Sequence, residues 1–410
     1  MDATAQHEIG NLKWTYVLVG ATDATLLPYV PLYLAQRGLS APAIGVVLAV
    51  AAAATFATGV GWAQLADRRF SPERMVVGAC LTAALVALLL PVSRGAATLS
   101  VVFVALSVAR APFTLLDPIT LRKLRDTPRT DYARIRLRMS AGWAASAIAS
   151  GWLFQATGLH VIPFIYASLS VLLGVWVYRA LKPFRVTPAV EASAQPAQPA
   201  QPAQPVRPSR VPIALVTFLL SCLLLGVSLA ATQNFLVLQI NVLGGGALLI
   251  GAASAFQAMT EIPTMGYTHV LTKYLRHRTL FAIGCAIYLA IFVAWAFTGS
   301  ALVAAVLRLA AGVAFALTLV SAVMITNDLV PARLRATGQA LMKAVLFGLA
   351  PIIGASGGGL VYGTIGARAM FLSSTVVVGA AGILALVAAP SRERRTTVIE
   401  PSASAAGASQ

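Results

Sequence analysis

The sequence predicts an all-α integral membrane protein with about twelve transmembrane helices in two six-helix bundles, and two observations lead to this fold class. First, 58% of the 410 residues are hydrophobic and 10% are charged, whereas soluble domains have about 25% charged residues. Second, uncharged runs such as 75–92 and 280–297 have the length of about 20 residues that crosses a hydrocarbon core of about 30 Å. Because backbone groups in lipid must bond within their own segment, we expect these runs to be helices.

Apolar windows bounded by charged residues, glycine and proline define the predicted helices in order. They lie near residues 14–36, 42–66, 75–92, 97–121, 131–156, 161–181, 212–240, 247–271, 279–298, 300–327, 337–362 and 367–390. The first window contains Asp23 and has little positive charge before it. It therefore predicts a first membrane helix and not a cleaved signal peptide.

The longest break between apolar windows divides the chain in the middle. Its stretch "AQPAQPAQPAQP" has a proline at every third position and nothing to bury, which predicts an extended, polyproline-like linker. The expected parts are an N-terminal six-helix bundle at 1–182, the linker at 183–211, a C-terminal six-helix bundle at 212–390 and a tail at 391–410.

Basic residues alternate between the gaps that separate the predicted helices. The gaps after every second helix hold Arg68, Arg69, Arg74, Arg122, Lys123, Arg125, Arg129, Lys182, Arg185, Arg207, Arg210, Lys273, Arg276, Arg278, Arg333 and Arg335. The opposite gaps hold little beyond Arg37, Arg94 and Arg368. By the positive-inside bias, both termini, the linker and the tail are expected on the cytoplasmic side of the cell inner (plasma) membrane.

Composition also limits the partners of the protein. The net charge of +17 comes mostly from arginines in these short gaps, where they serve topology, so we do not expect nucleic-acid binding. Cys80, Cys222 and Cys285 are dispersed in apolar runs, which fits neither a disulfide framework nor a metal site. No P-loop motif occurs, so an ion gradient is the expected energy source and no cofactor is expected.

Several charged residues fall inside the predicted helices. They are Asp23, Arg110, Asp117, Arg136, Glu261, Arg308 and Lys343. A charge at a helix centre costs about 2.5 to 3.5 kcal/mol on the insertion scale, so each should face protein or water and find a partner. The set predicts a polar interior between the helices.

Counting depth at about 1.5 Å per residue suggests two pairs among these charges. Asp23 and Arg110 lie near the middle of the bilayer, as a static structural ion pair or as a titrating or substrate-binding pair. Glu261 and Lys343 have comparable depths and form the second predicted pair, again with a structural alternative. Arg308 has no obvious acidic partner in the seventh, ninth or tenth predicted helix.

The segment "RIRLRMSAGW" at the start of the fifth helix has an arginine at every second position, after a predicted N-cap at Thr130. Arg134 and Arg138 share a face and can reach the headgroups, whereas Arg136 shares its face with Trp143. A guanidinium fork and a flat indole can bind an anion or hydroxyl groups. In the alternative, all three arginines serve topology and the tryptophan packs in the core.

In the seventh helix, the polar cluster "TQN" includes Gln233 and Asn234, which fit either a cavity lining or contacts with other helices.

These residues resemble a known family over nearly the full length of the chain. The resemblance is to the major facilitator superfamily, in the branch with the lactose/proton symporter, nucleoside/proton symporters and phenylpropionate permease-like proteins. It is carried by the fifth-helix segment above, "AMTEIP" in helix 8, "LLPYVPLYL" in helix 1, "RATGQALMKAVLFGLAPIIGASGGGLVYGTIG" in helix 11 and the loop "LADRR". In that loop motif Ala63 stands where the superfamily has glycine, and the Gly-Arg end is absent.

The resemblance implies roles for particular residues. Substrate binding is implied for Arg136, Trp143, Asp117 and Glu261. Gating is implied for Asp67 and Arg68 of the loop, which would meet the start of helix 11 near Gly338. The histidine and acidic coupling residues of the lactose symporter's tenth helix have no counterpart here, where only Arg308 is charged. Proton coupling would therefore need Asp23, Asp117 or Glu261 to titrate.

The expected function is secondary active transport of a small polar or anionic organic solute by alternating access, with proton-coupled uptake. The charged residues within the predicted helices include one more cation than anions, which favours an anionic solute. Efflux by proton antiport is the transport alternative, and an intramembrane enzyme or receptor is the other class considered. The expected partners are the solute, the proton and membrane lipid, and the protein is expected to be a monomer.

Overall fold

The structure, a computed structural model, describes residues 3–68, 71–124, 130–181, 213–331 and 334–388. In this part of the chain the regular structure is entirely helical. The first half holds α1 Ala3–Ala24, α2 Val30–Gln36, α3 Ala41–Arg68, α4 Pro72–Ala87, α5 Ala96–Arg110, α6 Leu116–Lys123, α7 Thr130–Thr157 and α8 Ile162–Ala180. The second half holds α9 Ile213–Val242, α10 Ala247–Tyr274, α11 His277–Phe297, α12 Ala301–Val306, α13 Arg308–Leu329, α14 Arg335–Lys343, α15 Ala350–Thr364 and α16 Ala367–Val387.

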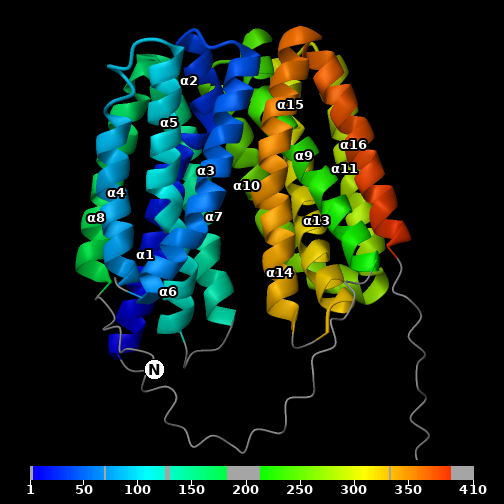
Figure 1. Cartoon of the computed structure of the whole chain (residues 1–410), viewed down its shortest axis with the longest axis horizontal. Helices are drawn as coiled ribbons and strands as arrows, with labels where there is room; N and C mark the ends of the chain where they lie inside the picture. The colour runs from blue at the N-terminus through cyan, green and yellow to red at the C-terminus, as the bar shows by residue number, and fades with distance from the viewer. Residues whose placement is uncertain (1–2, 69–70, 125–129, 182–212, 332–333, 389–410) are drawn as a thin grey trace, which may run out of the picture.

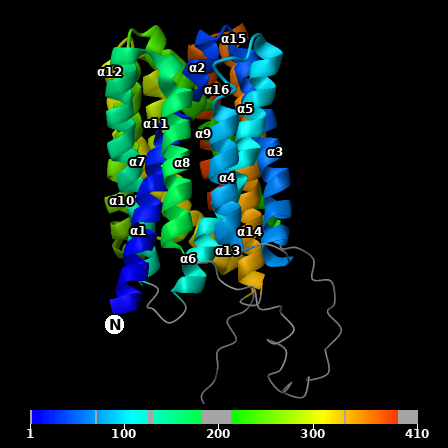
Figure 2. The ribbon, with the colours of Figure 1, turned by 90° about the vertical axis from the view of Figure 1, so that its left-hand side faces the viewer.

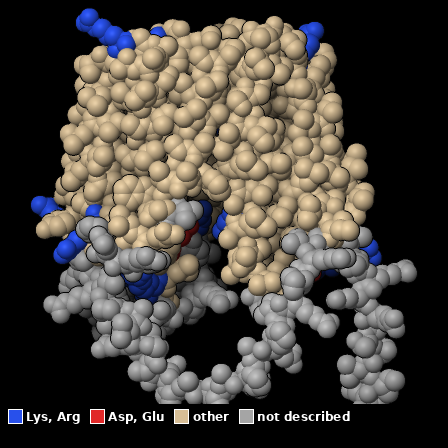
Figure 3. Space-filling model, in the orientation of Figure 1, with Lys and Arg blue, Asp and Glu red and all other residues tan. Residues whose placement is uncertain are grey.

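The helices stand side by side with roughly parallel axes, as Figures 1 and 2 show. Nine stretches of the described chain are long and apolar enough to cross a membrane, and α4, α7 and α10 run alongside them to give the twelve predicted spans. On the side shown in Figure 3, Lys, Arg, Asp and Glu keep to the two rims and to a hollow between the halves. This distribution fits an apolar belt in contact with lipid.

The N-terminus marks one end of the bundle, at the bottom of Figure 1, and we call this end the N-terminal face. The first half of the chain, coloured blue to teal, lies beside the second half, coloured green to red. The predicted linker and tail fall within 182–212 and 389–410, outside the described residues.

Four of the spans are interrupted, which the sequence analysis did not predict. Short segments η1 Leu27–Tyr29 and η2 Ala111–Leu115 split the first and fourth spans, a break at Leu307 splits the tenth, and a π-helical segment η5 Ala344–Leu349 splits the eleventh. Proline explains three of the breaks, because it withholds an N–H donor and its ring clashes with the preceding turn. Pro28, Pro112 and Pro351 stand in or just after these segments. By contrast, α10 continues as a helix through Pro263.

Each interruption adjoins charged residues that the sequence places inside the membrane. Asp23 is the penultimate residue of α1, Arg110 ends α5, Asp117 is second in α6, Arg308 opens α13 and Lys343 ends α14. Irregular backbone at membrane depth is tolerated where it lines a cavity. The breaks therefore mark where the helices turn polar groups inward.

Small residues hold the two halves together at the end opposite the N-terminal face. A Cβ atom on Gly45 of α3 would overlap the Ala355 carbonyl of α15, and one on Gly251 of α10 would overlap the Ala147 carbonyl of α7. Such close backbone approach is typical of packing between membrane helices. The opposite face is therefore closed by two tight helix pairs, α3 with α15 and α7 with α10.

Candidate functional site

A cavity lies between the two halves and has three connected parts. The central pocket, of about 520 Å³, is lined by Arg136, Met139, Ser140, Trp143, Gly226, Leu229, Ala230, Gln233, Asn234, Ser254, Gln257, Ala258, Glu261, Arg308, Phe315, Leu346, Phe347 and Pro351. The upper pocket, of about 330 Å³ and toward the opposite face, shares Trp143 and Arg308 with it. The vestibule, of about 790 Å³ and toward the N-terminal face, shares Arg136 with it.

The vestibule meets the hollow in Figure 3, where charged side chains show between the halves close to the N-terminal face. Because the other end is packed shut, the cavity is open toward the N-terminal face. A volume of several hundred cubic ångströms with few convergent polar groups is typical of small-molecule sites.

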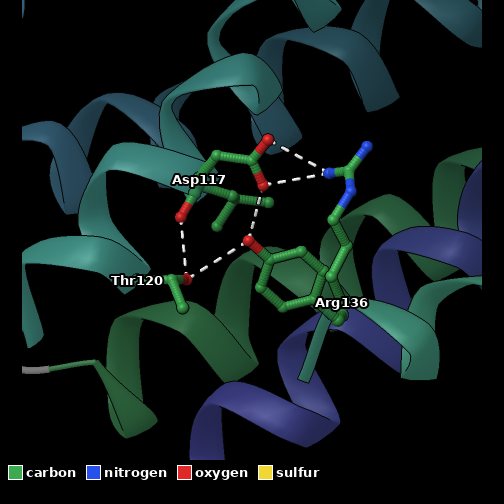
Figure 4. Close-up of polar contacts among 5 residues, drawn as sticks. Asp117, Thr120 and Arg136 are labelled. Carbon is green, nitrogen blue, oxygen red and sulfur yellow. Dashed lines mark hydrogen bonds and ion pairs between the residues drawn. The ribbon is translucent and has the colours of Figure 1, made fainter. Parts of the chain in front are cut away.

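Asp117 and Arg136 form an ion pair across α6 and α7 (Figure 4). The Arg136 Nη1 atom donates to both carboxylate oxygens of Asp117, at 3.1 and 3.0 Å. The Tyr16 hydroxyl donates to the same carboxylate at 2.7 Å, and the Thr120 hydroxyl donates to Tyr16 at 3.3 Å. The pair is accessible to solvent, since 53% of the Arg136 side chain and 41% of the Asp117 side chain are exposed. The two side chains can therefore separate to bind a ligand.

Asp23 and Arg110 form the predicted pair between the first and fourth spans. Arg110 Nη2 donates to Asp23 Oδ1 at 2.5 Å, and the side chains are only 14% and 11% exposed. The Arg110 guanidinium lies 5.8 Å from the centre of the Tyr166 ring. Both charged residues line the vestibule wall.

Trp143 connects the two halves inside the central pocket. Its Nε1 donates to Ser254 Oγ of α10 at 2.9 Å. As the spacing predicts, Trp143 shares the pocket with Arg136, seven residues earlier on α7. Arg138 on the same helix is exposed and is absent from the lining of the pocket, whereas the side chain of Arg134 lies outside the described residues.

Glu261 and the glutamine one turn before it, Gln257, line the central pocket from α10. Arg136 is close enough to exert an electrostatic effect on the Glu261 carboxylate. Gln233 and Asn234 line both the central and upper pockets from α9, so the cavity alternative holds for the "TQN" cluster. Six polar or charged side chains, Arg136, Ser254, Gln257, Glu261, Gln233 and Asn234, thus line the same pocket as Trp143.

Arg308 lines the central and upper pockets from the break before α13. Its Nε and Nη1 atoms are buried and have no hydrogen-bond partner in the described part of the chain. Its main electrostatic neighbour is the Tyr288 hydroxyl of α11, whose oxygen is likewise buried without a partner there. This agrees with the sequence analysis, which found no acidic partner for Arg308.

The expected Glu261–Lys343 pair does not form in this structure. Lys343 lines the vestibule and Glu261 the central pocket. The expectation used depth along a helix, which does not say which helices are neighbours. Here α10 packs on α7 and α13, whereas α14 packs on α13, so the two side chains do not face one another.

The expected gate cannot be compared atom by atom, because the side chains of Asp67 and Arg68 lie outside the described residues. Gly338 is buried in α14, where an added Cβ would lie 2.9 Å from Val330. Thr130 is the first residue of α7, one position earlier than predicted, and its side chain is also outside the description.

Sequence reasoning missed several polar residues of the cavity, among them Tyr16, Ser140, Ser254 and Gln257. Three of these could have been found by helical spacing: Gln257 and Ser254 lie four and seven residues before Glu261, and Ser140 lies four residues after Arg136. Tyr16 gave no such signal, since only the packing of its helix directs it to the cavity.

Comparison with known proteins agrees with this architecture. Residues 9–373 match the model of the MFS_1 like family. Maltose permease of Geobacillus stearothermophilus is 27% identical over 383 residues, covering 92% of this chain and 94% of that protein.

Solved structures of two transporters have the same fold. The nucleoside transporter NupG superposes with a TM-score of 0.74 at 17% identity, over 93% of this chain and 98% of NupG. A bacterial homologue of the human lysosomal transporter Spinster, in an inward-facing and occupied conformation, gives 0.66 at 14% identity, over 95% and 97%.

The twelve-span fold, the cavity between its halves and a family match over most of the length lead to one conclusion: the chain belongs to the MFS_1 like family and is a membrane transporter of the major facilitator type, not an enzyme.

Proposed function

We propose that this protein is a secondary transporter of a small polyhydroxylated solute, of the sugar or nucleoside class, and that the central pocket is its binding site. The observation that carries the proposal is the combination in one pocket of Trp143 with Arg136, Glu261, Gln233 and Asn234. Planar hydrogen-bonding groups bind neighbouring hydroxyls, and an indole face covers the apolar side of a sugar or base. The names of two similar proteins, a maltose permease and a nucleoside transporter, support the same class.

Alternating access is the proposed mechanism. In the described conformation the solute reaches the central pocket from the N-terminal face through the vestibule. Opening the opposite face requires separation of α3 from α15 and of α7 from α10, the pairs that close it. Rocking of two halves around a central site produces this exchange.

We further propose that transport is coupled to protons through Glu261, in the direction of uptake. Glu261 is the acidic residue of the central pocket, and in the described chain it has no ion pair within 4.0 Å. A carboxyl group that faces both the solute and the field of Arg136 can exchange a proton as the solute comes and goes. The basic gaps support a cytoplasmic N-terminal face, in which case the described conformation faces inward.

Uptake into proteoliposomes tests the proposal. Radiolabelled maltose, glucose, glucuronate, uridine and adenosine are offered with and without an imposed pH gradient, acidic outside. We expect accumulation of one solute class that needs the gradient, and exchange without net accumulation in Glu261→Gln. Accumulation that does not depend on the gradient would contradict proton coupling. A gradient-dependent loss of preloaded solute would show that the direction of transport is efflux. No movement of any sugar or nucleoside would overturn the solute class.

A further inference from the structure

The cavity holds more positive than negative groups once its internal pairs are counted. Asp23 is paired with Arg110 and Asp117 with Arg136. The remaining charged residues of the lining are Glu261, Arg308 and Lys343. Neither Arg308 nor Lys343 has a carboxylate within 4.0 Å among the described residues, so the cavity keeps one excess cation.

Arg308 is the unpaired cation that lies deepest. Its Nε and Nη1 atoms are shielded from solvent and lack any hydrogen-bond partner in the described chain, while the residue lines the central and upper pockets. A guanidinium buried without a counter-ion in a membrane protein is costly, and such residues mark ligand pathways. The positive charge of this guanidinium therefore calls for a negatively charged partner.

The helices packed against α13 offer no resident partner for Arg308. The described residues of α9, α11, α12 and α14 contain no aspartate or glutamate. Asp328 stands near the far end of α13 and pairs with His277 at 3.0 Å. Glu261 of α10 is the remaining acid among the described residues of the second half; its electrostatic neighbours are Arg136 and the Tyr288 hydroxyl, and it forms no ion pair with Arg308 within 4.0 Å.

Resting on the proposed function, we propose that Arg308 is a carboxylate-binding residue of the central cavity, and that the transported solute is a polyhydroxylated carboxylic acid, an acidic sugar. One unpaired cation balances one negative charge, which a carboxylate carries, whereas a phosphate monoester carries about 1.5 to 2 charges at neutral pH. The planar fork of arginine matches a carboxylate. The hydroxyl groups of the solute then face Trp143, Gln233 and Asn234 in the same pocket.

Lys343 extends the excess of positive charge toward the N-terminal face. Lys343 lies in the vestibule, whose two acids pair with Arg110 and Arg136, and Arg308 is shared by the central and upper pockets. A cleft with an excess of one sign of charge raises the local concentration of the opposite ion. The net positive charge of the cavity thus favours entry of an anion.

The test compares matched neutral and acidic ligands on the purified full chain. Dissociation constants are measured by isothermal titration for glucose against glucuronate, maltose against maltobionate, and uridine against uridine 5′-monophosphate. We expect the wild type to bind a carboxylate sugar at least about tenfold more tightly than its neutral partner, as one charged hydrogen-bonded contact provides. Arg308→Gln should abolish this preference, so that the acidic and the neutral ligand of each pair bind with similar dissociation constants.

Two variants complete the design. Arg308→Lys keeps the charge and should retain part of the preference, whereas Arg368→Gln serves as the matched control, because Arg368 contacts the Ala296 carbonyl and the Phe297 ring and is absent from the cavity lining. Equal binding of neutral and acidic sugars by the wild type overturns the inference even if Arg308→Gln fails to fold. A preference for the phosphate over the carboxylate also overturns it. Absence of binding by every sugar and nucleoside, neutral or acidic, is a different result and overturns the proposed function itself.

Discussion

Trp143 on α7 donates its indole hydrogen to the Ser254 hydroxyl on α10 at 2.9 Å, so one side chain both lines the solute pocket and joins the two halves of the chain. A solute that stacks on the indole therefore touches the residue whose partner must move away when the opposite face opens. Trp143 therefore takes part both in solute binding and in the contact between the halves. A ligand shifts a conformational equilibrium through contacts that differ between the two states.

Removing the Ser254 hydroxyl should loosen the closed opposite face. In Ser254→Ala the Trp143 donor loses its partner, at a cost of about 1 to 3 kcal/mol to the described conformation. Cysteines placed at Gln155 and Leu248, which are in contact near the opposite face, should then crosslink in lower yield than in the parent. Ser254→Thr keeps the hydroxyl and is the control. An unchanged yield in Ser254→Ala would show that the hydrogen bond does not bias the two states.

The glycine contacts of the opposite face should be needed for transport more than for insertion. Gly45→Ala places a methyl group on the Ala355 carbonyl, so α3 and α15 cannot close. We expect normal membrane expression and a loss of at least about tenfold in transport rate, the effect of an overpacking cost of about 1 to 3 kcal/mol on the closed state. Gly61→Ala on the same helix is the matched control, because nothing lies within 4 Å of its added methyl. Equal transport by the two variants would contradict the assigned closure.

The two ion pairs should differ in their contribution to stability. Asp23→Asn leaves Arg110 without its counter-ion in a buried site, which costs about 3 to 5 kcal/mol. Asp117→Asn breaks an exposed pair, worth about 0 to 1 kcal/mol. Thermal unfolding in detergent should therefore show a large fall in melting temperature for Asp23→Asn and a small one for Asp117→Asn. The reverse order would mean that the exposed pair, and not the buried one, holds the first half together.

Arg136→Lys should impair transport much more than Arg138→Lys. The lysine keeps the charge but loses the planar fork that reaches Asp117 and the solute, whereas Arg138 is exposed on the same helix. Initial rates at equal membrane expression measure the difference, which we expect to be at least about tenfold, the loss of one charged hydrogen bond. Similar rates for the two variants would indicate that Arg134, Arg136 and Arg138 all serve topology.

Sequence alone predicted the parts of this molecule that depend on local pattern. Hydropathy found the twelve spans, and heptad spacing put Arg136 and Trp143 on one face. The Asp23–Arg110 pair was confirmed because each charge had one plausible partner at its depth.

Features that depend on which helices pack side by side could not be predicted from local pattern. Glu261 and Lys343 lie in different parts of the cavity, on helices that are not neighbours, so their predicted pairing was wrong. The π-helical segment before Pro351 was missed because a proline signals a disturbed turn without fixing its hydrogen-bond register. Ser254 shares a helical face with Glu261, seven residues later, but its hydrogen bond to Trp143 depends on the docking of the two halves, which no periodicity within α10 encodes.

Side-specific labelling of one cysteine in the central pocket tests the central claim, that one cavity carries the solute and is reached from the two faces in turn. Ser140→Cys places a thiol in the pocket, while the native Cys80, Cys222 and Cys285 are buried and make the wild type a control of low background. In sealed vesicles of both orientations, we predict rapid reaction with an impermeant maleimide from the N-terminal face, additional reaction from the opposite face during turnover, and protection by the transported solute from either face. Reaction from one face only during active transport, or no protection by a solute that is being transported, would contradict the account.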